Sequence, residues 1–330
     1  MTEAQSDQQY NALLEACTSN DLSRFESLLD DASIAEVALA SPVKPCGLTT
    51  RPILNLSDFL EGAAKAGHSD IVEKVLAFAQ RNNIAYDKLI DRCSAVAAIE
   101  GTNSLEVFRV FVKVWPESAK LDMGLTQDPL SYSIAKRQVE LVKLLLDNGA
   151  DPNRACAAYK GPGYYLRMSV RVSTNLEDME ALLQHGAQIK HSGAIQEAAR
   201  LGRVDALQLL LNYGADVNER LPKDVGFLER KKRDQHASET PLHVAVLNNK
   251  VEIMRWLLTH GADAGIEDLQ GRTAEMIARD LGKDEMIHYS EIGVNEFIRS
   301  SFKNTTYVSS ASNKDETIVP TTITRRISQP

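Results

Sequence analysis

The stretch from Glu239 to Asp263 constrains this chain most, because it holds the start, the break and the stop of two short helices. Thr240 can cap a helix with its hydroxyl, and Pro241 follows at the first helical position, where its missing N–H costs nothing. Apolar residues then recur at helical spacing up to Gly261, which can adopt the left-handed conformation that ends a helix. Each helix is too short to be stable alone, so the stretch predicts a helix pair that packs against neighbours.

These residues resemble an ankyrin repeat. Thr240-Pro241-Leu242-His243 opens the pattern, Leu257-Leu258 lies inside it and Gly261-Ala262-Asp263 closes it. The resemblance implies an all-α fold, an ankyrin-repeat solenoid of stacked helix-turn-helix units, whose short first helices and hairpin tips form a concave face. It also implies that His243 is structural, hydrogen-bonded to its own turn and to neighbouring loops.

The pattern recurs along the chain at a nearly constant step. Val75, Val110 and Leu145 are each 35 residues apart, as a solenoid predicts. The clearest units are 122–153, 192–218 and 239–263. We expect about eight units over 9–290, with capping units at both ends, the C-terminal one over 268–289. A flexible N-terminus over 1–8 precedes them, and a connector or packed loop occupies 34–52. A disordered Ser/Thr-rich tail follows over 291–330.

One repeat, over 164–189, is degenerate in its first helix. The pattern fits if Leu166 and Val170 face the core and one residue is inserted before Leu176. In this register Arg167 and Arg171 face outward.

Composition limits the classes of function. The net charge is −8 at pH 7, which argues against a general nucleic-acid binder. No apolar run suits a secretory signal or a membrane span. The four cysteines are far apart and predict free thiols in a reducing compartment. We therefore expect a monomeric protein without membrane insertion, located in the cytoplasm, with nuclear entry as the alternative.

The sequence contains no recognisable catalytic, cofactor or metal motif. His185 and His260 each precede a glycine that ends a helix, where a partial positive charge is favourable. His191 lies near His185, but the sequence supplies no further ligands for a metal. We expect a protein that is not an enzyme and needs no cofactor.

Function in such an array depends on exposed positions of the first helices. Arginine and tyrosine are frequent hot spots in protein interfaces, although the same residues can be merely solvated. Ala135 and Val244 are also expected to face outward from the first helices. The candidate partner-binding residues are Tyr132, Lys136, Arg167, Arg171, Glu197, Arg200, Leu201, Leu247 and Asn248.

An inserted loop over 219–238 interrupts the repeat pattern and is locally basic. Its run Arg230, Lys231, Lys232 and Arg233 suits a nuclear-import signal or a contact for an acidic partner. A solvated, flexible loop is the third interpretation. In the tail, Arg325-Arg326-Ile327-Ser328 resembles a basophilic kinase site, which makes Ser328 a candidate phosphosite.

Together these features predict a non-catalytic protein–protein interaction adaptor or scaffold that binds a partner on its concave face. The alternative is a nuclear regulatory cofactor or a substrate-receptor subunit of a larger enzyme complex. Asn153 and Asn218 occupy hairpin positions where the resemblance implies a structural role.

Overall fold

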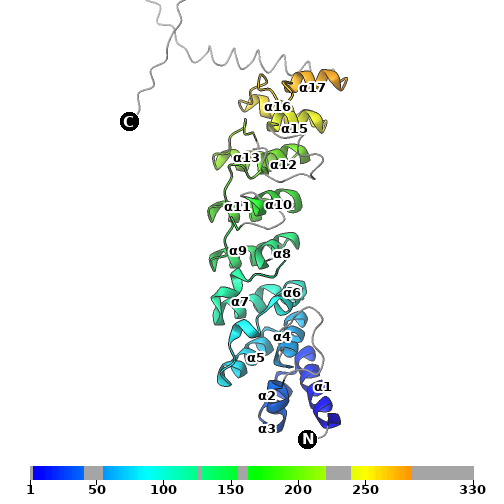
Figure 1. Cartoon of the computed structure of the whole chain (residues 1–330), viewed down its shortest axis with the longest axis vertical. Helices are drawn as coiled ribbons and strands as arrows, with labels where there is room; N and C mark the ends of the chain where they lie inside the picture. The colour runs from blue at the N-terminus through cyan, green and yellow to red at the C-terminus, as the bar shows by residue number, and fades with distance from the viewer. Residues whose placement is uncertain (1–2, 41–54, 125–127, 155–162, 221–238, 284–330) are drawn as a thin grey trace, which may run out of the picture.

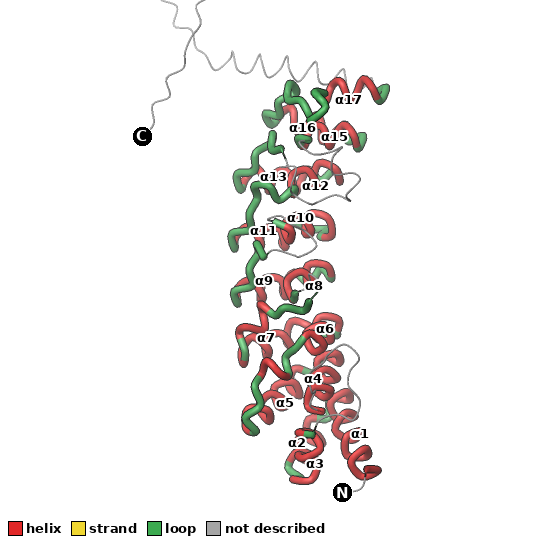
Figure 2. Tube along the Cα trace, viewed as in Figure 1, coloured by secondary structure: helices red, strands yellow, loops and turns green. Residues whose placement is uncertain are grey.

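The computed structural model describes residues 3–40, 55–124, 128–154, 163–220 and 239–283. In these ranges the chain forms sixteen α-helices, two short 3-10 helices and no strand. Helix pairs stack one upon another into an elongated array with two columns of helices (Figure 1). Figure 2 shows that loops join the successive helices of the two columns. The fold is an all-α solenoid.

The first helices of the pairs form one column, in which each packs against the next along the array. The second helices form the other column, and α5, α7, α9 and α11 pack successively there. The first column contains α4 (Asn55–Ala66), α6 (Arg92–Glu100), α8 (Pro129–Ala135), α10 (Tyr164–Val172), α12 (Ala194–Leu201), α15 (Pro241–Leu247) and α17 (Ala274–Asp280). The second contains α5 (Ser69–Arg81), α7 (Ser104–Val114), α9 (Val139–Asp147), α11 (Glu177–Gln184), α13 (Val204–Asn212) and α16 (Val251–Thr259).

The remaining described elements lie at the N-terminal end and between pairs. Helices α1 (Glu3–Ser19), α2 (Leu22–Leu29) and α3 (Ala32–Leu39) form the first layer. The 3-10 helices are η1 (Tyr86–Lys88) and η2 (Pro116–Lys120).

Capping boxes begin several first helices, as the sequence predicts for α15. The Thr240 hydroxyl accepts a hydrogen bond from the backbone of His243, whose ring pairs with the Thr240 backbone in return. Asp128 and Ser131 make the same reciprocal pair at the start of α8. Each box satisfies two backbone N–H groups that a helix start otherwise leaves without partners.

Glycines in the left-handed conformation end the second helices. Gly149, Gly186, Gly214 and Gly261 have φ between 83° and 91°. The N–H of the following alanine then bonds back to a carbonyl of the last turn, as from Ala262 to Leu257 at 2.9 Å. This Schellman arrangement needs a positive φ that glycine adopts without steric cost.

The core runs continuously between the two columns. Leu145, Leu210 and Leu257 of the second helices are fully buried, and Leu166 and Val170 of α10 are buried as the predicted register requires. A single pair could not bury these side chains, so the stacking of pairs holds the array together.

The N-terminal region differs from its prediction in two places. Helix α1 begins at Glu3, whereas the sequence predicted flexibility through residue 8. Helix α3 occupies residues 32–39, where a loop or connector was expected from residue 34. Asp31 caps α3. The buried residues of α3 are Ile34, Val37 and Ala38, and the helix packs against α1 and α4. A helix of eight residues depends on packing for its stability, and the local sequence pattern does not predict that packing.

Candidate functional site

The first-helix face, defined here as the exposed side of α8, α10, α12 and α15, holds most of the predicted partner-binding residues. On α8, the Tyr132 hydroxyl donates to Glu100 of α6, and the Lys136 ammonium lies 3.5 Å from the same carboxylate. The Lys136 Nζ also lies 5.4 Å from the centre of the Tyr132 ring. These contacts join two neighbouring repeats and leave Lys136 exposed.

A carboxylate held by two arginines lies at the centre of this face. Glu197 of α12 accepts from Arg171 Nε of α10 at 2.9 Å and from Arg200 Nη2 at 2.7 Å on one oxygen. Arg200 Nε donates to the other oxygen at 3.1 Å. The structure therefore brings together three of the predicted residues from two adjacent helices.

Burial opposes the charged form of Glu197, but the hydrogen bonds from Arg200 and Arg171 outweigh it and lower the pKa of this carboxyl. Glu197 is thus ionised at neutral pH. The cluster of two arginines and one glutamate carries a net charge of +1.

Three predicted outward residues, two of them candidate partner-binding residues, are buried, which corrects their assignment as exposed contacts. Glu197 is 7% exposed and Arg167 is 5% exposed. Val244, at the corresponding position of α15, is also buried. Each residue lies near the middle of a first helix that packs between two others, so neighbouring side chains cover it. Arg171, Arg200 and Lys136 lie nearer the helix ends and remain exposed.

The C-terminal part of the face is less polar. Leu201 and Leu247 are half-buried and lie in the last turns of α12 and α15. Asn248 is exposed, but its amide donates to the Val244 carbonyl at 2.8 Å and so completes the end of α15. These positions add apolar surface beside the arginine pair.

Three histidines, His185, His243 and His260, have structural contacts. His243 Nδ1 lies 2.8 Å from the Thr240 hydroxyl and Nε2 lies 3.1 Å from the Arg272 carbonyl of the next unit. His185 Nδ1 contacts the Ala181 carbonyl at 2.8 Å, within its own helix end. His260 Nδ1 does the same with the Trp256 carbonyl at 2.7 Å. The expected structural role of His243 agrees with these hydrogen bonds.

Hairpin asparagines link successive tips. Asn153 donates to the Gly186 carbonyl at 2.8 Å and accepts from the Gln188 N–H at 2.7 Å. Asn218 makes the equivalent pair with Gly261 and Asp263. Each asparagine side chain therefore bonds to backbone groups of the next repeat and links the two repeats, in agreement with its predicted structural role.

Sequence reasoning missed a buried polar cluster at the base of the inserted loop. Glu219 is 7% exposed; one of its carboxylate oxygens accepts from the His191 N–H, and its backbone carbonyl accepts from the Gln196 amide at 2.9 Å. Glu219 Oε2, Gln196 Oε1 and His191 Nδ1 are buried without a hydrogen bond, and His191 Nδ1 lies 3.8 Å from Glu219 Oε1. Burial raises the pKa of Glu219. Nothing in the local pattern distinguishes Glu219 from a loop glutamate.

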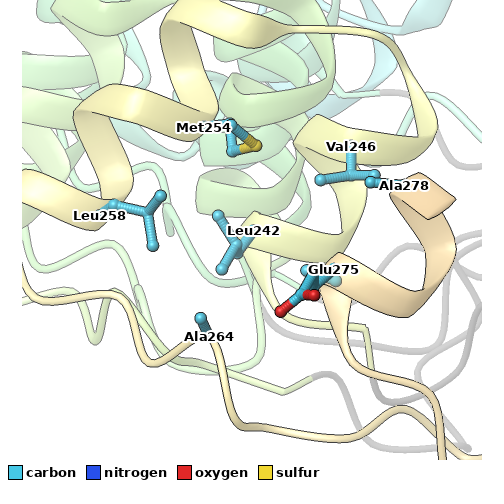
Figure 3. A pocket seen from close by; sticks show the side chains of 8 residues that line it. Leu242, Val246, Met254, Leu258, Ala264, Glu275 and Ala278 are labelled. Carbon is cyan, nitrogen blue, oxygen red and sulfur yellow. The ribbon is translucent and has the colours of Figure 1, made fainter. Parts of the chain in front are cut away.

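Hollows lie at two places between the described helices. The first lies between α15, α16 and α17 and is lined by mostly apolar side chains, among them Leu242, Met254 and Ala278 (Figure 3). Its volume is about 10 Å³, while one water needs roughly 10–15 Å³. It is a small packing gap.

The second hollow, of about 330 Å³, lies on the second-helix side between α9 and α11. Lys143 bridges the two helices by pairing with Glu177 at 3.0 Å, and His185 pairs with Asp147 at 3.1 Å. Four of its charged side chains thus already contact one another in pairs.

Within the described ranges, no three His, Cys, Asp or Glu residues gather as metal ligands. No described helix is both long and apolar enough to cross a bilayer. The basic run at 230–233, Ser328, the tail over 291–330 and the end of the C-terminal cap beyond residue 283 lie outside the described residues.

Comparison with known proteins agrees with the helix pairs and their caps. The family model "Ankyrin repeats (many copies)" matches residues 195–258, and the model "Ankyrin repeat" matches 127–157. Residues 127–157 and 195–258 are therefore ankyrin repeats. Proteins with this repeat bind other proteins and are generally not enzymes.

Several curated proteins are similar to parts of the chain. Ankyrin repeat and SOCS box protein 6 from Pongo abelii is 31% identical over 202 residues, which are 56% of this chain and 42% of the relative. I-Kappa-B like protein C2 from Microplitis demolitor bracovirus is 32% identical over 85 residues, 26% of this chain and 40% of the relative. Human protein phosphatase 1 regulatory subunit 27 is 34% identical over 79 residues, 23% of this chain and 42% of the relative. The matches span less than half the length of these relatives.

Proposed function

We propose that this chain is a non-catalytic adaptor or scaffold that binds a partner protein on its first-helix face. The observation that carries the proposal is the arrangement of exposed side chains from successive first helices on one side of a stacked core. Lys136, Arg171, Arg200 and Leu247 come from four consecutive repeats on this side.

The physical basis is preorganisation. Each first helix is capped, packed between neighbours and tied to the next repeat by hydrogen bonds such as those of Asn153. Little backbone entropy is therefore lost on binding, and the exposed residues can set the choice of partner.

A second candidate function is a nuclear regulatory cofactor or a substrate-receptor subunit of a larger enzyme complex. It is supported by the basic run at 230–233 and by similarity to a protein named for a SOCS box and to an I-kappa-B like protein. We place the protein in the cytoplasm, with nuclear entry as the alternative. Imaging a variant with residues 230–233 neutralised would separate the two, because loss of nuclear signal would support the second candidate.

Affinity purification from native cells tests the principal proposal. A variant carrying Tyr132→Ala, Arg200→Ala and Leu247→Ala should lose partners that the wild type retains, while its thermal melting stays close to that of the wild type. A matched control changes exposed positions of the second helices, Lys113→Ala, Gln208→Ala and Arg255→Ala, and should keep those partners. Equal partner sets for all three proteins would contradict binding on the first-helix face.

A further inference from the structure

The arrangement of Arg171, Glu197 and Arg200 differs from an ordinary surface ion pair. The Glu197 side chain is 9% exposed, whereas those of Arg171 and Arg200 are 50% and 43% exposed. The acid lies beneath the two bases and contacts both. An exposed pair contributes little to stability, and a lysine or arginine near a helix end is often explained by the helix dipole. Neither explanation accounts for a buried carboxylate shared by guanidinium groups from two helices.

Glu197 restricts where the guanidinium groups can lie. Arg171 donates to it from Nε alone, so Nη1 and Nη2 of Arg171 make no other hydrogen bond within the described chain. Arg200 donates from Nε and Nη2, which leaves its Nη1. The remaining donors belong to exposed groups that a buried anchor has already ordered, so a ligand would lose less side-chain entropy on binding them.

The surroundings of the pair are also positive. Lys136 and Arg137 lie at the end of α8, which packs against α10, and both are exposed. Lys136 pairs with Glu100, and Arg171 and Arg200 pair with Glu197. With Arg137, these four basic and two acidic residues sum to +2 on a chain whose net charge is −8. Half-buried Leu201 and Leu247 continue the face toward α15.

We propose that Arg171 and Arg200 clamp a carboxylate from an acidic segment of the partner protein, with Glu197 as the residue that positions both arginines. Carboxylates accept two parallel N–H bonds from a guanidinium group, and such charged bonds are about twice as strong as neutral ones. The segment lies across α8, α10, α12 and the end of α15, and its apolar side chains contact Leu201 and Leu247. This inference rests on the proposed function and adds the chemistry of the partner.

A random peptide library displayed on phage tests the inference with the full-length chain. Peptides selected by the wild type should be enriched in aspartate and glutamate, and their affinity, measured by fluorescence anisotropy with labelled peptide, should fall as salt is added. The double variant Arg171→Gln, Arg200→Gln should bind them at least about tenfold more weakly.

Two further variants separate the clamp from general effects of charge or folding. Arg109 of α7 pairs with Glu106 three residues earlier, as Arg200 pairs with Glu197, but it lies on the second-helix side. Arg109→Gln should therefore leave peptide affinity unchanged. The double variant Arg171→Lys, Arg200→Lys keeps both charges above Glu197 and protects the fold, yet lacks the planar fork and should still bind more weakly than the wild type.

The outcomes distinguish this inference from the proposed function. Selected peptides that lack acidic enrichment but lose binding with Leu201→Ala, Leu247→Ala would overturn the clamp and leave first-helix binding in place. Full affinity in the lysine double variant would also overturn the clamp. Peptides that bind regardless of every substitution on this face would overturn both.

Discussion

At the residue scale, two buried glutamates have pKa values shifted in opposite directions because their hydrogen-bond partners differ. Glu197 is buried but accepts hydrogen bonds from two arginines, and its pKa is lowered. Glu219 is equally buried, but its carboxylate accepts a hydrogen bond from one backbone N–H, that of His191, and burial raises its pKa. The difference follows from the partners that the fold brings to each carboxyl group.

Glu219→Gln should therefore stabilise the protein at neutral pH. The folded-state pKa of Glu219 lies above its ordinary value of about 4.3, so burial of the carboxylate disfavours the fold at all pH values above the folded pKa. The amide removes this charge and keeps an oxygen acceptor for the His191 N–H. We expect a gain in stability at neutral pH that shrinks as pH falls through the folded pKa toward the ordinary value.

Chemical denaturation at a series of pH values would measure this gain. Glu252→Gln, at a side chain that is 79% exposed, is the matched control for removal of one negative charge. A gain of equal size at acidic and neutral pH would show that the charge of Glu219 is not its source.

At the scale of an element, α15 shows how a seven-residue helix is kept in place. It has a capping box at its start, an asparagine at its end and a buried side packed against α12, α16 and α17. Leu242 lies on that buried side, whereas Leu247 lies on the first-helix face and is half-buried. Packing contributes most of the stability of so short a helix.

Leu242→Ala should destabilise the C-terminal repeats by about 2–5 kcal/mol, because it removes buried methyl groups beside an existing small gap. Leu247→Ala, on the same helix, should cost less than about 1.5 kcal/mol because its side chain is only half-buried. Urea unfolding followed by circular dichroism compares the two. Equal losses would mean that position on the helix does not decide the effect.

At the scale of the whole molecule, each layer contacts mainly its neighbours. In the described part of the stack (Figure 1), the main contacts join helices of the same or neighbouring repeats. Distant helices such as α4 and α17 do not pack against each other. Stability in such an array is close to a sum of repeat and neighbour contributions. Damage at one end should therefore remain local.

Hydrogen exchange would reveal this locality. Ile277→Ala, which creates a cavity in α17, should increase exchange in α15 to α17 and leave protection in α4 to α7 unchanged. Leu145→Ala in α9 is the matched change at the centre and should affect the repeats on both sides of it. If Ile277→Ala increased exchange equally in α4, the array would unfold as one cooperative unit.

Local sequence was sufficient to predict the elements whose signals are contained in a few residues. The capping of α15 at Thr240, the helix stop at Gly261 and the burial of Leu166 and Val170 were all predicted and all agree with the structure. Each depends on backbone conformation or helical periodicity, which neighbouring residues along the chain determine.

Tertiary structure alone decided which polar side chains are covered and what they contact. Arg167 and Glu197 were expected to face outward, and α3 was not predicted as a helix; the structure buries both side chains and packs α3 against α1 and α4. The Glu219 cluster was likewise invisible in the sequence. Burial of a side chain depends on neighbours that come from other repeats. The pattern within one segment therefore predicts its helices, but not which of its polar side chains stay exposed.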